Sequence, residues 1–466
     1  MAGEGDAPLR PYQGRTVDWL VERGGNGLLA LPLGSGKSRV TIEYLKTLPV
    51  GCYTLVVAPK VALASWEKEL ARWWPEEYVT LWQGTPQKRR TAWNVYLKDS
   101  GVLLVNYALL GQLGALVSKF NTIVFDESHT VRNRRTKQFK NARRIRADRV
   151  ICLTGSPVVN GGQDLWSQMH LIDRKRFSSF WDFATTFLLM SKDRFGTHIE
   201  GIKDPEALQA YLGPYMLRLE RADVLSDLPP KTRQVVPIAL YPEQRDLYDT
   251  LAKEMLARLG TDEAGERWLL APNTIALVTR LRQITILPEL VGADVRSSLM
   301  DALMDSVEES DSECRPVLIF SPFARALEHV RDLLLRDPTR ETHFIRGGMS
   351  ATAIGEEVAE FQDSPSTRKA LLCTTALGTS FTATAATTVL FLGCAWSPSA
   401  NYQAEDRAMR IGQDHPVYVR YLVGEGTIDE HIEDVLDKKV LWAELATNPA
   451  LLLCPPKERR ARFSDT

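Results

Sequence analysis

The chain has 466 residues, of which 44% are hydrophobic and 25% are charged, and its formal net charge is −1. This composition is typical of a globular protein with about two to four domains. No stretch approaches about 18 uncharged apolar residues, so we expect no membrane-spanning helix. The balanced charge excludes a uniformly basic nucleic-acid coat, but it leaves room for a local basic groove.

The N-terminal segment MAGEGDAPLR carries acids and lacks the apolar core of a signal peptide, so we expect the protein to stay inside the cell. Six cysteines form no C-x-x-C pair, and several lie in apolar, strand-like runs. This pattern indicates reduced thiols without a disulfide framework. The histidines have no zinc-binding spacing, so a zinc site is not expected.

Short β-branched and apolar runs alternate with helical patterns and fall into two groups. The first group is 28–31, 54–58, 102–106, 122–126 and 150–154; the second is 317–321, 343–346, 370–374, 388–392 and 418–422. Continuous apolar runs of this length between helices indicate buried parallel strands. Two such groups predict an α/β protein with two parallel-sheet lobes.

The stretch between the two groups lacks this strand rhythm and has helical patterns instead. These patterns lie at 164–173, 207–217, 243–259 and 275–284. They predict a helical protrusion on each lobe, at about 165–216 and at about 241–310. The pair Pro229-Pro230 stops a helix and stiffens a linker, so we place the boundary near it, with lobes of residues 1–225 and 226–466.

The strongest local motif is Leu33-Gly34-Ser35-Gly36-Lys37-Ser38, which follows the first apolar run. A phosphate chain needs backbone N–H donors at a helix N-terminus, and glycines that let the backbone approach it. Lys37 would neutralise the phosphates, and the Ser38 hydroxyl would ligate Mg²⁺. Leu31 occupies the first glycine position of G-x-x-x-x-G-K-[ST], so a flexible basic turn is the alternative. The strand before and the helix after favour a phosphate loop.

A second motif, Asp126-Glu127-Ser128-His129, lies at the end of the run 122–126. An NTPase needs one carboxylate for Mg²⁺ and another near the attacking water. Two adjacent acids at the carboxyl end of a strand supply both. For an isolated Asp-Glu pair, a helix N-cap is the simpler interpretation. The phosphate loop upstream favours the catalytic one.

A third motif, QAEDRAMRIGQ, spans residues 403–413 and places Arg407 and Arg410 three residues apart. That spacing puts both guanidinium groups on one face of a predicted helix. Together they suit a γ-phosphate reached across a cleft, as an arginine finger does. By spacing alone, a solvated amphipathic helix with an Arg–Glu pair is an equal alternative.

These motifs, in this order, resemble those of superfamily-two helicase-type ATPases of the Swi/Snf chromatin-remodeller family. The resemblance covers about residues 8 to 445. It rests on LRPYQ, LVVAPKVALASWEKEL, LLVNYALL, DESH, LTGSPVVN, the inter-lobe segment YMLRLERADVLSDLPPKTRQVVPIALYPEQRDLYD, and the ending QAEDRAMRIGQDHPVYVRYLV with GTIDEHI. It implies two RecA-like lobes with helical protrusions.

The chain departs from the family pattern in two motifs. The phosphate loop reads LPLGSGKS where the family usually has D-E-M-G-x-G-K-T, and Ser38 keeps the hydroxyl that threonine would supply. Motif V usually reads G-G-x-G-L-N-L, and here it is LGTSFTA at residues 377–383. Two of its glycines are therefore replaced, in a segment that the family uses for DNA contact and lobe coupling.

The resemblance also implies roles for individual residues. Adenine would be held by Arg10 and Gln13, and the phosphates and Mg²⁺ by Gly34, Ser35, Gly36, Lys37 and Ser38. Asp126 would support Mg²⁺, Glu127 would orient the water, and Gln403, Arg407 and Arg410 would complete the site from the second lobe. The candidates for coupling or DNA contact are Lys60, Thr154, Gly378 and Ser380.

The implied activity is an ATPase, using ATP and Mg²⁺, that translocates on duplex DNA without sequence specificity and remodels protein–DNA complexes or branched DNA. The expected partners are duplex DNA and DNA-bound proteins, and the motor is expected to be monomeric. A strand-separating DNA or RNA helicase and a catalytically silent DNA-binding scaffold are the alternatives. Few residues flank the motor, so we expect a bacterial or phage protein in the cytoplasm with the nucleoid, or a nuclear one if the source is eukaryotic.

Residues 132–149 hold nine arginines or lysines and one acid. This basic strip is either a solvated helix or a surface that contacts phosphates, in which case its affinity would fall steeply with salt.

Overall fold

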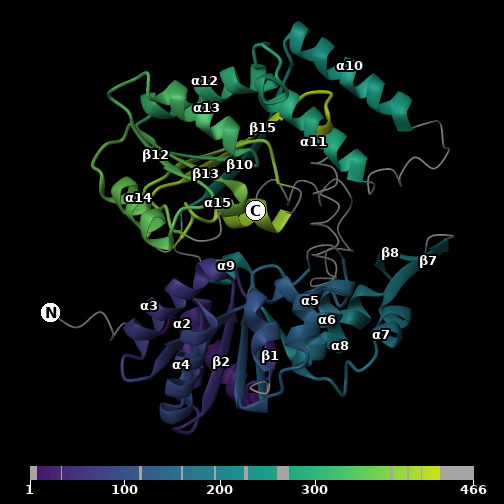
Figure 1. Cartoon of the computed structure of the whole chain (residues 1–466), viewed down its shortest axis with the longest axis vertical. Coiled ribbons are helices and arrows are strands. Elements are labelled where there is room, and N and C mark those ends of the chain that lie inside the picture. The colour runs from purple at the N-terminus through teal and green to yellow at the C-terminus, as the bar shows by residue number, and fades with distance from the viewer. Residues whose placement is uncertain are drawn as a thin grey trace. The chain divides into compact units, whose positions relative to one another are not determined.

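The computed structural model describes residues 8–32, 34–114, 118–158, 161–193, 196–224, 229–259, 272–377, 381–395, 398–410 and 412–430. The chain divides into two compact units, whose main segments are Met1–Asp227 and Leu228–Lys438, here called the first and second lobes. Each lobe contains one parallel sheet with helices packed on it (Figure 1). Within the described ranges, no helix is both long enough and apolar enough to cross a bilayer.

The first lobe is built on seven parallel strands. Their order is β3 (Val79–Leu81), β4 (Gly101–Asn106), β2 (Tyr53–Ala58), β5 (Thr122–Asp126), β6 (Arg149–Thr154), β1 (Gly27–Ala30) and β9 (Met216–Arg218). The register aligns Val57 with Phe125, and Phe125 with Cys152. Because all seven strands are parallel, their carboxyl ends meet at one edge, where ligands of α/β proteins gather.

Helices cover both faces of the first sheet, which explains why its strands are apolar throughout. Leu28, Leu55 and Leu103 belong to the core on one face, whereas Leu29, Val56 and Leu104 belong to the core on the other. The helices are α1 (Pro11–Glu22), α2 (Lys37–Lys46), α3 (Leu63–Trp73), α4 (Pro86–Asp99), α5 (Lys137–Ala142), α6 (Gln163–Ile172) and α9 (Arg221–Val224).

The segment expected to form the helical protrusion of the first lobe is only partly helical. It contains α6, α7 (Phe180–Phe187) and α8 (Pro205–Leu212), but an antiparallel hairpin of β7 (Leu188–Asp193) and β8 (Gly196–Ile202) lies between α7 and α8. The predicted helices are present in this segment, but the hairpin between them was not predicted. Leu188 and Ile202 pair at the base of the hairpin and are buried there, so tertiary packing overrides any local helical preference.

The second lobe is built on six parallel strands. Their order is β10 (Lys231–Ile238), β15 (Val417–Gly424), β14 (Thr388–Leu392), β11 (Val317–Ser321), β13 (Lys369–Thr374) and β12 (Glu341–Ile345). Its helices are α10 (Pro242–Leu259), α11 (Pro272–Ile286), α12 (Ser298–Ser312), α13 (Ala324–Leu334), α14 (Ala351–Asp363) and α15 (Pro398–Glu405). The five described cysteines are free thiols.

The two parallel sheets confirm the α/β fold expected from the apolar runs. Each of the predicted strands is present, with ends shifted by at most two residues. The strands β3, β9 and β10 and the hairpin were not predicted. In β10 exposed and half-buried residues alternate, because it lies at the edge of its sheet, so it lacks the continuous apolar run that marks the others.

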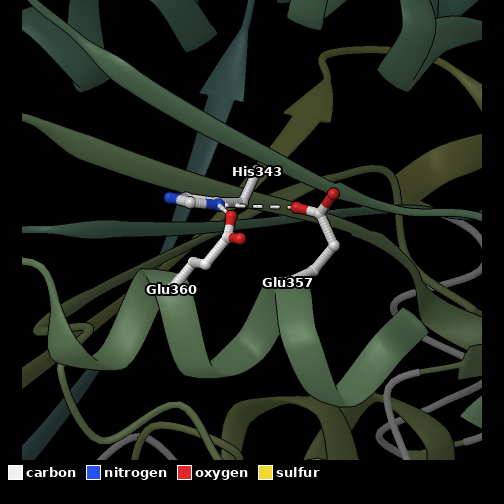
Figure 2. A group of neighbouring side chains, drawn as sticks. All are labelled: His343, Glu357 and Glu360. Atoms are coloured by element: carbon white, nitrogen blue, oxygen red, sulfur yellow. Dashed lines mark ion pairs between the residues drawn. The ribbon is translucent and has the colours of Figure 1, made fainter. Parts of the chain in front are cut away.

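A polar contact ties α14 to the edge strand β12 of the second sheet. Figure 2 shows Glu357 and Glu360, one turn apart on α14, both directed toward His343 on β12. The Nδ1 atom of His343 lies 3.4 Å from Oε2 of Glu357 and 3.9 Å from Oε2 of Glu360. In the part of the chain that the structure describes, these three side chains form the group whose geometry could hold a metal ion. The Glu360 side chain is 71% exposed, and exposed acidic groups of this kind are common without a metal.

Candidate functional site

The loop between β1 and α2 has the backbone conformation that an anion-binding loop requires. Gly34 and Gly36 adopt φ angles of 77° and 73°, in the left-handed region that favours glycine. Gly36 also lies against α1, where an added Cβ would come within 2.6 Å of Nε2 of Gln13. The loop therefore needs glycine at this point, and it leads directly into the N-terminus of α2 at Lys37.

Polar groups of this loop are available for a phosphate chain. The Lys37 amine donates to the backbone carbonyls of Leu31 and Pro32, both at 3.1 Å, so it is folded over the loop. The Ser35 hydroxyl is buried and has no hydrogen-bond partner among the described residues. Ser38 lies in the first turn of α2. A cation and an unsatisfied donor at a helix N-terminus fit the phosphates of ATP and an associated Mg²⁺.

The start of α1 contacts the same loop. Nε2 of Gln13 donates to the carbonyl oxygen of Ser35 at 3.2 Å, while Oε1 of Gln13 accepts from the backbone N–H of Arg10 at 3.0 Å. The hydroxyl of Tyr12 donates to the same Ser35 carbonyl at 2.7 Å. Arg10 and Gln13, expected to hold adenine, thus lie beside the phosphate loop. Tyr12 belongs to the LRPYQ motif, but its contact with the loop had no signal in the sequence.

Asp126, at the end of β5, is held from three directions. Its Oδ2 accepts from the indole N–H of Trp66 at 2.8 Å, and its Oδ1 accepts from the backbone N–H of Glu127 at 3.0 Å. Its carbonyl oxygen accepts from the hydroxyl of Tyr107 at 2.6 Å. Loss of water and the charge of Glu127 raise the pKa of Asp126 to about 6, while Lys37 acts in the opposite direction.

Glu127 connects the paired acids to β6 through a histidine. Its backbone is left-handed, with φ of 47°, an unusual conformation for a residue with a side chain. The Nδ1 atom of His129 lies 3.3 Å from Oε2 of Glu127 and 3.2 Å from Oγ1 of Thr154. Thr154 also accepts from the backbone N–H of Ser156 at 3.0 Å. The sequence placed His129 in a motif without giving it a role, and the structure places it between Glu127 and Thr154.

The remaining candidate residues of the first lobe also lie at the carboxyl ends of its parallel strands. Lys60 begins a short 3₁₀ turn at the carboxyl end of β2 and is exposed. Thr154 ends β6 and is buried. Lys37, Lys60, Asp126 and Thr154 therefore follow neighbouring parallel strands at one edge. Gly378 and Ser380, the candidates from motif V, lie outside the described residues.

The arginine motif of the second lobe does not form one continuous helix. α15 ends at Glu405, and residues 406–410 form a turn and a bend. Arg407 Nε bonds back to the carbonyl of Gln403 at 2.8 Å, and its Nη1 donates to the carbonyl of Phe381 at 2.9 Å. The expectation that Arg407 and Arg410 share a helix face was therefore wrong, because α15 ends before both arginines and the backbone continues as a turn and a bend.

The two arginines differ in their surroundings. Arg407 is 3% exposed and Gln403 is also buried. Arg410 is half-buried and donates to Oγ1 of Thr382 at 2.8 Å. Both arginines thus contact the segment at 381–382, the described end of motif V. Arg410 is the more accessible of the two guanidinium groups.

Glu405 anchors the same motif to the sheet of the second lobe. It is fully buried, and its carboxylate pairs with Lys231 at 2.9 Å and with Arg233 at 2.7 Å. The hydroxyl of Tyr421 donates to it at 2.5 Å. Burial alone would raise the pKa of Glu405, but Lys231 and Arg233 hold it below its usual value. Sequence spacing gave no sign of this network, because its members come from β10, α15 and β15.

The basic strip at 132–149 runs from the turn after β5 to the start of β6, so its last residues lie at the amino ends of the strands. Only residues 137–142 are helical, and Phe139, Ala142 and Ile145 are buried. Nη1 and Nη2 of Arg174 donate to the carbonyls of Arg143 and Ile145, at 2.7 and 2.6 Å. Residues 143–148 precede β6, whereas Thr154 ends it. The strip is thus a fixed, exposed basic surface and not one solvated helix.

Two models of known protein families match the chain. A model described as the SNF2-related domain matches residues 12–290, and one described as the helicase conserved C-terminal domain matches residues 297–412. The first match alone covers more than half of the chain.

Several individual proteins are similar to this chain over most of its length. It is 28% identical to the putative ATP-dependent helicase/translocase YwqA of Bacillus subtilis, over 92% of this chain and 48% of that protein. It is 28% identical to the human DNA annealing helicase and endonuclease ZRANB3, over 93% of this chain and 40% of that protein. The Sulfolobus solfataricus SWI2/SNF2 ATPase core in complex with dsDNA is 26% identical, covers 99% of this chain and 98% of its own, and has a TM-score of 0.45. The chain spans less than half the length of both curated relatives.

Proposed function

The chain belongs to the SNF2-related family of helicase-like ATPases, and on that premise we propose that it is an ATP-dependent translocase on double-stranded DNA. In this proposal it remodels protein–DNA complexes or branched DNA. The proposal rests on three features that lie together at the carboxyl ends of the strands of the first sheet. They are the glycine-containing loop before α2, the adjacent carboxylates of Asp126 and Glu127, and the contact of His129 with Thr154. Both family matches support the same activity.

ATP would be bound by the first lobe through its loop and the start of α1. Backbone N–H groups of Gly34 to Lys37 and the Lys37 amine would hold the phosphates, and Gln13 lies beside them. Ser38 and Asp126 would hold Mg²⁺, which when bound neutralises charge on the phosphates. The Lys37 amine bonds to two backbone carbonyls, and phosphate oxygens would replace these acceptors when nucleotide binds.

Hydrolysis would be carried out by Glu127, with His129 orienting it. Glu127 would align the attacking water, and a protonated His129, whose Nδ1 lies 3.3 Å from Oε2 of Glu127, would attract the carboxylate. Because His129 also contacts Thr154, a change at the end of β6 would be felt at the carboxylate. This pair of contacts is a physical route by which DNA bound at the carboxyl edge of the sheet could alter hydrolysis.

Arg410 is the better candidate of the second lobe for contact with the γ-phosphate. Arg407 is buried and bonded to carbonyls of Gln403 and Phe381, so its first role is to hold its own lobe. Arg410 is partly accessible. A guanidinium group that stabilises transition-state charge need not contribute to nucleotide affinity.

DNA would be held through its phosphates and not through base edges. Lys60 is exposed near the carboxyl ends of the strands, on the same side as the candidate ATP site. The basic strip adds exposed Arg143, Arg144 and Arg146 near the amino ends of the strands. Contacts of this type carry no sequence information and weaken with salt. We therefore propose sequence-independent binding to duplex DNA.

Two other functions fit the fold. A strand-separating helicase would use the same ATP site, and a silent scaffold would keep the fold without hydrolysis. Phosphate release in the presence of duplex DNA, single-stranded DNA or RNA distinguishes them. Strongest stimulation by duplex DNA is expected, whereas stimulation by RNA alone or the absence of any hydrolysis would overturn the proposal.

A further inference from the structure

The indole of Trp66 lies in the core of the first lobe, yet its polar atom reaches the candidate Mg²⁺ ligand. Trp66 is in the first half of α3 and is 2% exposed, packed with Leu63 and Leu70 on the inner face of that helix. A buried indole N–H needs an acceptor, and here the acceptor is Oδ2 of Asp126 at 2.8 Å. A phenylalanine would keep an aromatic ring in the core, with some loss of packing, but could not make that bond.

The bond fixes one carboxylate oxygen while the rest of Asp126 is held by other groups. Oδ1 accepts from the backbone N–H of Glu127, and the carbonyl accepts from Tyr107, which is itself buried. Free rotation of the carboxylate about its χ2 angle is therefore blocked on both sides. The helix α3, which bears Trp66, directly follows the turn that begins at Lys60, a candidate DNA contact.

We propose that Trp66 is a positioning residue: its indole N–H orients the carboxylate of Asp126 for Mg²⁺, and Tyr107 fixes the backbone of the same residue. The inference rests on the proposed function, because Asp126 is a metal ligand only if the site binds Mg²⁺ with nucleotide. Hydrogen-bond partners of metal ligands commonly change metal affinity by about ten- to a hundredfold when they are removed.

The test compares Trp66→Phe with the control Trp82→Phe in the full chain. Trp82 is also buried in the first lobe and also donates its indole N–H, but to the carbonyl of Arg89 at 2.9 Å, in another part of the lobe. Each variant thus loses one indole hydrogen bond. ADP binding is measured by calorimetry over a Mg²⁺ series and in EDTA, together with the thermal unfolding midpoint.

The expected result is that Trp66→Phe needs about tenfold more Mg²⁺ to reach full ADP affinity, while its affinity in EDTA and its thermal midpoint match those of Trp82→Phe. Tyr107→Phe is expected to change the Mg²⁺ requirement in the same direction, compared with the control Tyr96→Phe, which loses a buried bond to the carbonyl of Thr54. An unchanged Mg²⁺ requirement in Trp66→Phe would overturn the inference. A drop in ADP affinity that is equal with and without Mg²⁺ would overturn it as well, because it would indicate a structural role.

Failure of this inference is separable from failure of the proposed function. The ADP measurements report on the orientation of Asp126 and use no DNA. The proposed function fails if the unmodified protein hydrolyses no ATP with duplex DNA. If the protein hydrolyses ATP but Trp66→Phe behaves as Trp82→Phe does, only the positioning role is lost.

Discussion

His129 Nδ1 lies 3.2 Å from Oγ1 of Thr154, which joins the turn after β5 to the end of β6. The same nitrogen lies 3.3 Å from the Glu127 carboxylate. His129→Ala should therefore lower DNA-stimulated turnover by about ten- to a hundredfold, as loss of an orienting partner commonly does, with little change in ADP affinity. Thr154→Val should act in the same direction and Thr154→Ser should not, because serine keeps the hydroxyl. Normal turnover in His129→Ala would contradict the contact's role.

Substitutions of Lys37 and Glu127 should affect nucleotide binding and ATP hydrolysis differently. Lys37→Ala should weaken nucleotide binding and abolish hydrolysis, because the phosphates lose their cation. Glu127→Gln should bind ATP and hydrolyse it very slowly, because the amide cannot act on the water as the carboxylate does. Nucleotide binding and phosphate release, measured on both variants, check this. Near-normal turnover in either variant would refute the assignment of these residues to the ATP site of the first lobe.

Substitution of Arg410 should mainly reduce ATP hydrolysis, whereas substitution of Arg407 should first reduce stability. Arg410→Ala should keep nucleotide binding and lose hydrolysis, by up to about 10³–10⁵-fold if it acts as an arginine finger. Arg407→Ala should first cost stability, about 1.5–3 kcal/mol, because a buried guanidinium loses its bonds to Gln403 and Phe381. Urea unfolding and single-turnover hydrolysis measure the two effects. If Arg410→Ala hydrolyses ATP normally on DNA, the second lobe does not complete the site in the way proposed.

The buried carboxylate of Glu405 should make the second lobe sensitive to acid. Glu405→Gln should destabilise the lobe by about 3–5 kcal/mol at pH 7, because Lys231 and Arg233 lose a buried partner. The folded-state pKa of Glu405 is lowered, so its contribution is fully present above the unfolded value of about 4.3 and is lost as pH falls through the folded one. The stability gap between the two proteins should therefore be constant from pH 8 to about pH 5 and narrow below that.

The control for this prediction is Glu309→Gln in the same lobe. Glu309 pairs with Arg420, but its side chain is 50% exposed. An exposed pair contributes less than about 1 kcal/mol, so this variant should remain close to the unmodified protein. Hydrogen exchange of β10 and β15, measured with urea unfolding, assigns the loss to the second lobe. Equal stability of Glu405→Gln and Glu309→Gln would contradict the anchoring role of Glu405.

The parts of the molecule that depend on local pattern could be predicted from sequence. Strands such as β2 and β11 are buried on both faces, so their apolar runs identify them. The glycines at 34 and 36 mark the loop because its backbone angles favour glycine. The sequence also predicted that Asp126 ends a strand, which the structure confirms, whereas the catalytic role of Asp126 and Glu127 stays a prediction.

The parts that depend on distant partners could not be predicted. The carboxylate of Glu405 is paired with residues of β10 that are far away in sequence, and the indole of Trp66 meets Asp126, which is 60 residues further along the chain. α15 ends at Glu405, and the side chain of Arg407 beyond it bonds to the carbonyls of Gln403 and Phe381, neither of which residue spacing shows. The hairpin at 188–202 forms because its base is buried against neighbouring helices.

The central claim, movement along intact duplex DNA driven by ATP, is tested most directly by displacement of a triplex-forming strand. The protein is mixed with ATP and a duplex that carries a labelled third strand, and Lys37→Ala serves as the control. A plain duplex of the same length is tested for strand separation in parallel. Our account predicts ATP-dependent release of the third strand on any flanking sequence, no release by Lys37→Ala, and little separation of the plain duplex. Efficient separation of the plain duplex without triplex displacement would contradict it and would indicate a strand-separating helicase.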